Sequence, residues 1–215
     1  MTGEELIAEG RRLARPCVHL RSDGELGNLA AMWGGPGQVA CPTPEHTHWL
    51  TVDCRFLPHG VGPRSGCLSV YTDDEDRFGV AIHDPLASLG VSGNGQRLYA
   101  HSIPSLPPLE AVFLYGSPAV RDWLTPLGWE PEDGMNGNFP ASDVTDPYVA
   151  AWQQDMPLYG DRAFAVLGGW HFPWPDGDWV ELVDRPLVVM TLADSEPWVE
   201  VFDMGGSFQV MQRIT

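Results

Sequence analysis

Residues 198–214 read WVEVFDMGGSFQVMQRI, which is two runs of strand-forming residues joined by two glycines. Glycine supplies the positive φ that the tight turns of a β-hairpin require, so Gly205 and Gly206 predict a two-residue turn. That turn fixes the register of the two strands and places Val201 opposite Val210. One face of the hairpin is apolar and is predicted to face the core: Val199, Val201, Phe208 and Val210.

The same alternation of apolar and polar residues recurs upstream and predicts further strands. In residues 48–56, for example, Leu50 and Val52 fall on one face while Thr51 and Asp53 fall on the other. This pattern is typical of an antiparallel sheet with one buried face. The other segments predicted to be strands are 17–21, 29–33, 67–71, 78–82, 97–101 and 186–192.

Three segments carry helix signals. Residues 4–15 have an apolar stripe, acids at the start and arginines at the end, which suits the helix macrodipole. Ser117 followed by Pro118 predicts a helix start for 117–127, and Ser142 predicts one for 142–155. Residues 109–115 are apolar and read as either a strand or a buried helix. We therefore predict an α+β fold, with residues 1–215 as a single domain whose mainly antiparallel sheet has about three helices packed against it.

The chain is strongly acidic, with 29 acidic and 12 basic residues and a formal net charge of −17. All twelve basic residues are arginines, which a GC-rich genome explains because lysine codons are AT-rich. Negative charge repels nucleic-acid phosphates and speeds the encounter with a basic protein. We expect no nucleic-acid partner and consider a basic protein as the partner. The alternative is that the acidity serves solubility alone.

No apolar run of the sequence is long enough to span a membrane. Residues 1–15 are charged and amphipathic and lack the apolar core of a secretory signal, so we expect a cytoplasmic protein with no membrane partner. The oligomeric state does not follow from the sequence. The four cysteines, Cys17, Cys41, Cys54 and Cys67, include no C-x-x-C pair and are predicted to be free thiols.

Residues 165–179, AVLGGWHFPWPDGDW, combine a short apolar run, two glycines and an aromatic loop. The apolar run predicts a buried strand that the glycines end. Pro173 and Pro175 hold the backbone of Trp174 extended, beside acids, where its ring could stack on a sugar or anchor a protein. The residues predicted to bind a ligand are His171, Phe172, Trp174, Asp176 and Asp178. The alternative is that these rings close the end of a hydrophobic core.

The densest group of metal-ligand residue types is Cys41, His46, His48, Cys54, His59 and Cys67. Zinc binds such side chains, but structural zinc sites usually contain closely spaced ligand pairs. His46 and His48 are the one close pair here. We assign no metal and no cofactor, and keep a zinc-dependent protein that uses the His46/His48 region as an alternative.

Sequence motifs of catalysis are absent: there is no G-x-S-x-G, no phosphate-binding loop with lysine and no dinucleotide fingerprint. Cys17 and His19 share one face of a predicted strand, but neighbours on one strand face rarely form a nucleophile–base pair. We assign no catalytic residue.

A compact acidic chain with nine tryptophans and an antiparallel sheet resembles, in composition, the bacterial immunity proteins that neutralise toxins. The resemblance rests on composition and carries over no residues. It implies a non-catalytic acidic binding protein, an inhibitor of a basic partner, which is the function we expect. Two alternatives stay open: a small sugar-directed hydrolase with its site at residues 170–179, and the zinc-dependent protein described above.

Overall fold

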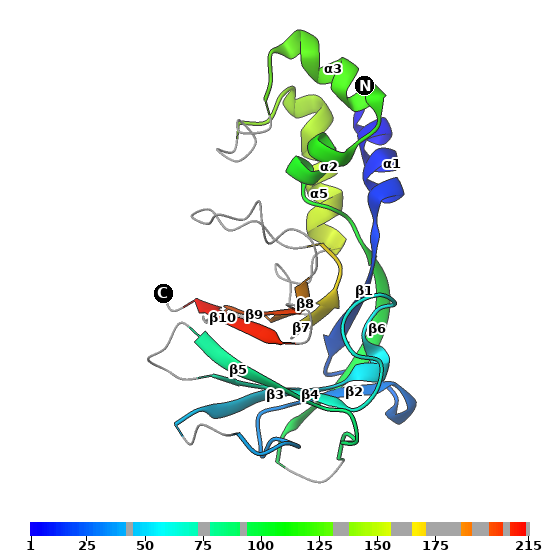
Figure 1. The fold of residues 1–215 in the computed structure, drawn as a ribbon. Coiled ribbons are helices and arrows are strands. Elements are labelled where there is room, and N and C mark those ends of the chain that lie inside the picture. The colour runs from blue at the N-terminus through cyan, green and yellow to red at the C-terminus, as the bar shows by residue number, and fades with distance from the viewer. Residues whose placement is uncertain are drawn as a thin grey trace.

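The computed structural model describes residues 1–41, 45–72, 78–90, 94–130, 138–155, 165–170, 186–190, 198–203 and 207–213. Its described strands form a closed barrel, and its helices gather in a lobe beyond one end of that barrel (Figure 1). The strands are β1 Arg15–Arg21, β2 Leu29–Trp33, β3 Thr47–Asp53, β4 Cys67–Thr72, β5 Phe78–Asp84, β6 Gln96–Ser105, β7 Ala165–Gly168, β8 Pro186–Met190, β9 Trp198–Asp203 and β10 Phe208–Arg213. Around the barrel they run β1-β6-β2-β3-β4-β5-β10-β9-β8-β7, and β7 pairs with β1.

The helices are α1 Gly3–Leu13, α2 Leu109–Tyr115, α3 Pro118–Leu124 and α5 Ser142–Asp155, with short 3₁₀ turns at η1 Leu26–Asn28, η2 Cys54–Phe56 and η3 Thr125–Leu127. A capping box starts α1, because the Thr2 hydroxyl accepts from the Glu5 amide while the Glu5 carboxylate accepts from the Thr2 amide. None of the described helices combines the length and the apolar character needed to cross a membrane.

The C-terminal hairpin has the predicted register. β9 and β10 pair antiparallel with Val201 opposite Val210, Phe202 opposite Gln209 and Trp198 opposite Arg213. Val201 is 0% exposed and Val210 is 2% exposed, so both valines face the core as expected. The two glycines of the turn lie outside the described residues.

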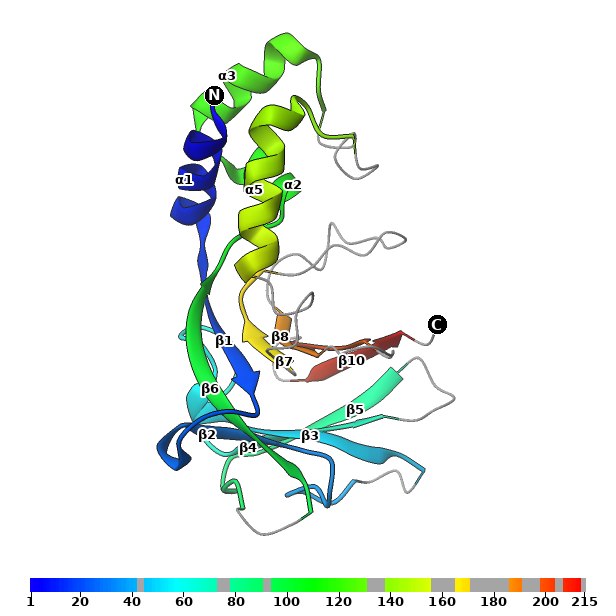
Figure 2. The same cartoon turned by 180° about the vertical axis from the view of Figure 1, so that it is seen from behind.

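The α+β class and the antiparallel sheet are confirmed, but the sheet closes on itself, which the sequence did not indicate. Strand side chains fill the barrel with one apolar core: Val18, Leu20, Leu50, Val52, Leu68, Val70, Leu98, Leu167, Val201 and Val210. A second core lies among the helices and includes Leu6, Val112, Phe113, Val120, Leu124, Val144 and Tyr148. The helices pack mainly on one another, and α1 lies against α5 (Figure 2). This differs from the expectation that the helices would pack against the sheet.

The structure decides one open alternative and corrects the bounds of two predicted strands. Residues 109–115 form a helix, since Ala111, Val112 and Phe113 are buried in the helical core and Pro108 precedes the first turn. β3 ends at Asp53, whose carboxylate accepts from the Arg55 amide and starts the 3₁₀ turn η2. β6 is much longer than the predicted 97–101, because it pairs with β1 along its C-terminal half and with β2 along the other.

The alternating pattern predicted a sheet with only one buried face. In the structure the outer face of the barrel is also covered in places. Every residue of β4 is buried, including Ser69 and Tyr71, which point away from the core. The segment after β2 lies over them: the Tyr71 hydroxyl donates to the Val39 carbonyl, and the His48 ring bonds to the carbonyls of Gly34 and Gly35. Polar groups on this face are therefore buried and hydrogen-bonded, as buried polar groups generally are.

Candidate functional site

The aromatic stretch 165–179 begins as predicted. β7 covers Ala165–Gly168, all four residues are buried, and Gly168 and Gly169 have φ of 66° and 85° where the strand ends. The five residues predicted to bind a ligand, His171, Phe172, Trp174, Asp176 and Asp178, lie outside the described residues. Their role, and the sugar-directed hydrolase that depends on it, therefore stay predictions.

Trp170, the last described residue of this stretch, joins the barrel to the helical lobe. Its indole Nε1 donates to the carbonyl of Leu13 at 3.0 Å, and its amide donates to the Ser105 hydroxyl at 3.3 Å. The guanidinium of Arg15 lies 3.5 Å from the ring centroid, and the Tyr115 ring lies 6.1 Å away. Trp170 thus contacts the ends of α1, β6 and α2 together with the start of β1, and only 7% of its surface is exposed.

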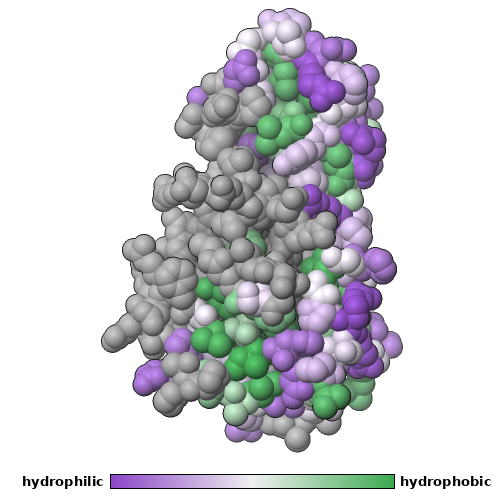
Figure 3. All heavy atoms as spheres, viewed as in Figure 1, coloured by the Kyte–Doolittle hydropathy of each residue, from purple (hydrophilic) through white to green (hydrophobic). Residues whose placement is uncertain are grey.

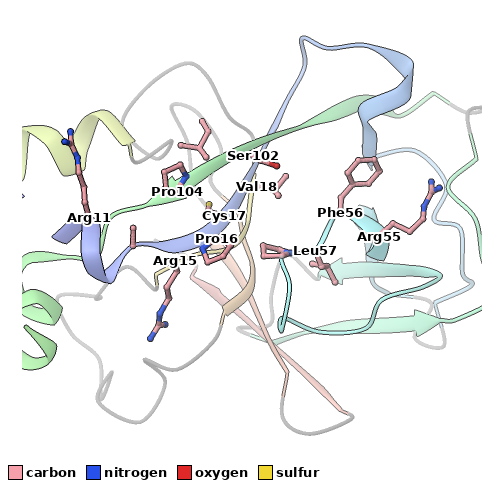
Figure 4. Close-up of a pocket in the computed structure, with 13 residues that line it drawn as sticks. Arg11, Arg15, Pro16, Cys17, Val18, Arg55, Phe56, Leu57, Ser102 and Pro104 are labelled. Carbon is pink, nitrogen blue, oxygen red and sulfur yellow. The ribbon is translucent and has the colours of Figure 1, made fainter. Parts of the chain in front are cut away.

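An open pocket of about 650 Å³ lies next to this joint, between the β1–β6 ladder and the η2 turn. Its thirteen lining residues come from three segments: Arg11 and 14–18, Arg55 to Pro58, and Ser102 to Pro104. Figure 4 shows Arg11 and Arg15 at one end of the pocket, Arg55 and Phe56 at the other, and Pro16 and Leu57 between them. The pocket therefore has an apolar middle and cationic ends.

The charge of the lining is opposite to the charge of the chain. Three of the thirteen lining residues are arginines and none is an acid. Arg55 is compensated, because its Nε lies 3.0 Å from both carboxylate oxygens of Asp53. Arg15 is stacked on Trp170, and Arg11 is exposed and forms no ion pair with a described residue. Arginines therefore lie at both ends of the pocket.

Cys17 also lines the pocket, and neither it nor His19 can work as a thiolate–imidazolium pair. Burial raises the pKa of the Cys17 thiol to about 12. Burial, with the nearby charges of Arg21 and His101, lowers the pKa of His19 to about 4. Catalytic cysteines need a low thiol pKa and a basic partner, so both shifts have the wrong direction for nucleophilic catalysis.

A chain of hydroxyl groups begins at His48. Carbonyl oxygens only accept hydrogen bonds, so its Nδ1 donates to Gly34 and Gly35, and Nε2 accepts from the Thr51 hydroxyl at 2.8 Å. Thr51 Oγ1 lies 2.8 Å from Ser69 Oγ. Burial lowers the pKa of His48 and favours this neutral form. Because Thr51 and Ser69 are 0% exposed, neither hydroxyl is open to a substrate, and the network holds β3 and β4 together.

The cysteine and histidine cluster of the sequence is dispersed by the fold. Cys54 and Cys67 are buried at one end of β3 and β4, His48 lies at the other end of β3, and His59 is exposed. Burial raises the pKa of Cys54 to about 12 and that of Cys67 to about 11. Across the described ranges, no three His, Cys, Asp or Glu side chains are grouped to hold a metal ion, and all four cysteines are free. The zinc alternative gains no support from this arrangement.

The pocket was not foreseen from the sequence. The sequence positions of Arg11 and Arg15 were already explained by the end of the predicted helix, where cations are favoured, so they did not indicate a pocket. Arg55 follows a strand with no motif around it. The three segments that line the pocket are far apart in the chain, and they come together through the pairing of β1 with β6 and the turn after β3.

Comparison with protein-family models, with curated proteins and with solved structures yields no match for this chain.

Proposed function

We propose that this chain is a non-catalytic binding protein that recognises a basic protein partner through its acidic surface. The observation that carries the proposal is the uneven distribution of charge. Residues 122–215 hold 16 of the 29 acids but only three of the twelve arginines. A surface of one sign steers a partner of the opposite sign into encounter and disfavours partners of the same sign.

The described part of the helical lobe has the same imbalance. Its exposed acids are Glu4, Glu5, Asp122, Glu130, Asp143 and Asp146. Its arginines are Arg11, Arg12 and Arg121, and Arg12 is held by Glu9, with 2.6 Å between its Nη2 and the Glu9 carboxylate. Figure 3 shows strongly hydrophilic residues along the outer edge of this lobe. The lobe is the part of the described surface that we assign to the partner.

Binding is favoured over nucleophilic catalysis because the hydroxyl groups of the His48 network and three of the thiols are buried. The hydroxyls of Thr51 and Ser69 are fully buried, and three of the four thiols are buried with raised pKa values. Free thiols suit the reducing cytoplasm, where we place the protein. A protein of this kind acts by covering its partner, as an inhibitor of a basic enzyme or toxin does.

The test uses the product of the adjacent gene, since an inhibitor and its target are expected to be encoded side by side. Isothermal titration measures its affinity for the wild type and for the double variant Asp122→Arg/Asp146→Arg, which reverses two exposed charges of the lobe. The matched control, Glu25→Arg/Glu45→Arg, makes the same change in net charge at exposed positions of the barrel. We expect a loss of about tenfold or more for the lobe variant, as close charge pairs at interfaces give, and less than about threefold for the control.

Equal losses in both double variants, or no binding of a basic neighbouring product, would contradict the proposal. The thermal unfolding of each variant is measured alongside, so that a loss of fold is not mistaken for a loss of contact.

A further inference from the structure

Three apolar side chains reach the surface of the helical lobe between α3 and α5. Leu127 is 49% exposed, Phe139 is 37% exposed and Trp129 is half-buried. The end of α3 and the start of α5 lie at the end of the lobe away from the barrel (Figure 1). We propose that these three residues, the tip patch, form the apolar centre of the interface with the basic protein partner. This inference rests on the proposed function and names the part of the acidic lobe that holds the partner once it has arrived.

A hydrogen bond brings the two segments of the tip patch together. The Trp129 indole Nε1 donates to the Asn138 carbonyl at 2.6 Å, and Phe139 is the next residue in the chain. The Trp129 ring also meets the Phe113 ring edge to face, with 4.3 Å between the ring centroids. Because Phe113 is buried in the helical core, Trp129 anchors the tip patch to the inside of the lobe.

The backbone around the tip patch is held in unusual conformations. Gly128 has φ of 64°, which glycine adopts at little cost, and Ala141 has φ of 49°, which is uncommon for a residue with a side chain. The Ala141 carbonyl accepts from the amides of Val144 and Thr145, which ties this strained residue to the first turn of α5. Strained backbone clusters at sites that bind ligands. A patch that is fixed before binding loses little conformational freedom when the partner docks, which favours affinity.

The surroundings of the tip patch are acidic. Residues 127–146 contain five acids and no basic residue. Asp143 and Asp146 are exposed on α5, and Asp122 is exposed on α3. Protein interfaces commonly have an apolar, aromatic centre inside a polar rim, and the rim charges of the two partners are complementary. The tip patch therefore fits a protein surface whose apolar centre is surrounded by lysine and arginine. The same acids repel an anionic lipid surface, which also takes up exposed apolar side chains.

The centre and the rim of such an interface act at different steps of binding. Rim charges change mainly the association rate and its dependence on salt, whereas most affinity differences between variants of one interface lie in the dissociation rate. Aromatic residues near the centre carry a large share of the binding energy. Loss of the Phe139 ring should therefore speed dissociation by a factor that does not depend on salt.

Surface plasmon resonance with the product of the adjacent gene compares the full chain with Phe139→Ala and Leu127→Ala. The matched control is Leu86→Ala, which makes the same change as Leu127→Ala at a 92% exposed position of the barrel. We expect Phe139→Ala to weaken the affinity by about tenfold or more and Leu127→Ala by about threefold or more, both through faster dissociation, and Leu86→Ala to change it by less than about twofold. These ratios should be the same at about 50 mM and about 500 mM NaCl, although every affinity falls with salt.

The outcomes separate this inference from the proposed function. If Asp122→Arg/Asp146→Arg weakens binding while Phe139→Ala and Leu127→Ala bind like Leu86→Ala, the tip patch is overturned and the acidic surface remains the binding site. A loss in Phe139→Ala that disappears at high salt also contradicts an apolar contact. An absence of binding by the wild type overturns both proposals. The thermal unfolding of each variant is measured alongside, and Leu127→Ala, at the more exposed position, decides the result should Phe139→Ala lower the stability.

Discussion

Gly10 is the residue of α1 where a side chain has no room. A Cβ atom at this position would lie 2.4 Å from Cε2 and 2.5 Å from Oη of Tyr148. Tyr148 is fully buried in the helical core, and its hydroxyl donates to the Pro107 carbonyl at 2.7 Å, so the ring has no easy way to move. The absence of a side chain at Gly10 therefore sets how closely α1 and α5 approach.

Gly10→Ala should lower the free energy of unfolding by about 1–3 kcal/mol, the usual cost of overpacking a core. This is the opposite of what helix propensity predicts, since alanine is the better helix former. Gly27→Ala is the matched control, because a Cβ there meets nothing within 4 Å and its effect should stay within about 0.5 kcal/mol. Urea denaturation measures both variants, and a Gly10→Ala variant as stable as the wild type would show that the helices are less closely packed.

The cysteines should differ in reactivity. Cys17, Cys54 and Cys67 are buried with raised pKa values, whereas Cys41 is only half-buried. A thiol reagent reacts with the exposed thiolate, so one thiol should react quickly at pH 7.5 in the native protein and four should react after denaturation. Two or more fast thiols in the native protein, or fewer than four in the denatured protein under reducing conditions, would be inconsistent with this description.

Among the elements, the joint at Trp170 makes a direct connection between the barrel and the helical lobe. Its indole is bonded to the last residue of α1 and its amide to the last residue of β6. Trp170→Phe keeps an aromatic ring but leaves the Leu13 carbonyl without this donor, which should cost about 1–3 kcal/mol. Trp123→Phe is a suitable control, since the Trp123 indole has no hydrogen bond to a described residue. Equal effects of the two substitutions on denaturation midpoints would mean that the bond to Leu13 contributes nothing.

The local elements are also where the sequence was most informative. Two glycines and alternating residues predicted the register of β9 and β10, and the predicted strand 29–33 has the bounds of β2. The choice between strand and helix for residues 109–115 depended on neighbours from other segments, since Val112 and Phe113 are buried against α1, α3 and α5. Local periodicity cannot decide between them, because a short apolar run is compatible with both a strand and a helix.

At the scale of the whole molecule, closure of the barrel could not be predicted from the sequence. It requires β7 to pair with β1, Cys17 lying opposite Gly168, and β10 to pair with β5, Val210 lying opposite Gly79. Both pairings join residues far apart in the chain, and an alternating pattern does not specify its partner strand. The pocket between the β1–β6 ladder and η2 depends on another long-range pairing, that of β1 with β6, so no local motif predicts it.

The stability of the whole molecule should fall on acidification through His19. The pKa of His19 is lowered from 6.5 to about 4, so between these values the unfolded chain binds a proton that the folded chain does not. The contribution of neutral His19 is therefore fully present above about pH 6.5 and is lost as the pH falls towards 4. The difference is worth up to about 3 kcal/mol.

Urea denaturation at pH 7.5 and pH 4.5 measures this effect, with His19→Gln as the comparison because glutamine does not titrate. The wild type should lose more stability between the two pH values than His19→Gln does. Equal losses of unfolding free energy in the two proteins would show that groups other than His19 cause the acid sensitivity.

The measurement that tests the central claim most directly is the salt dependence of the association rate with the basic partner, followed by stopped-flow mixing. If the acidic surface steers the encounter, the association rate constant should fall by about tenfold or more between 10 mM and 150 mM NaCl, because the screening length shortens from about 30 Å to about 8 Å. The dissociation rate should change much less. An association rate constant that is the same at both salt concentrations would contradict the account and leave the charge of −17 without a role in binding.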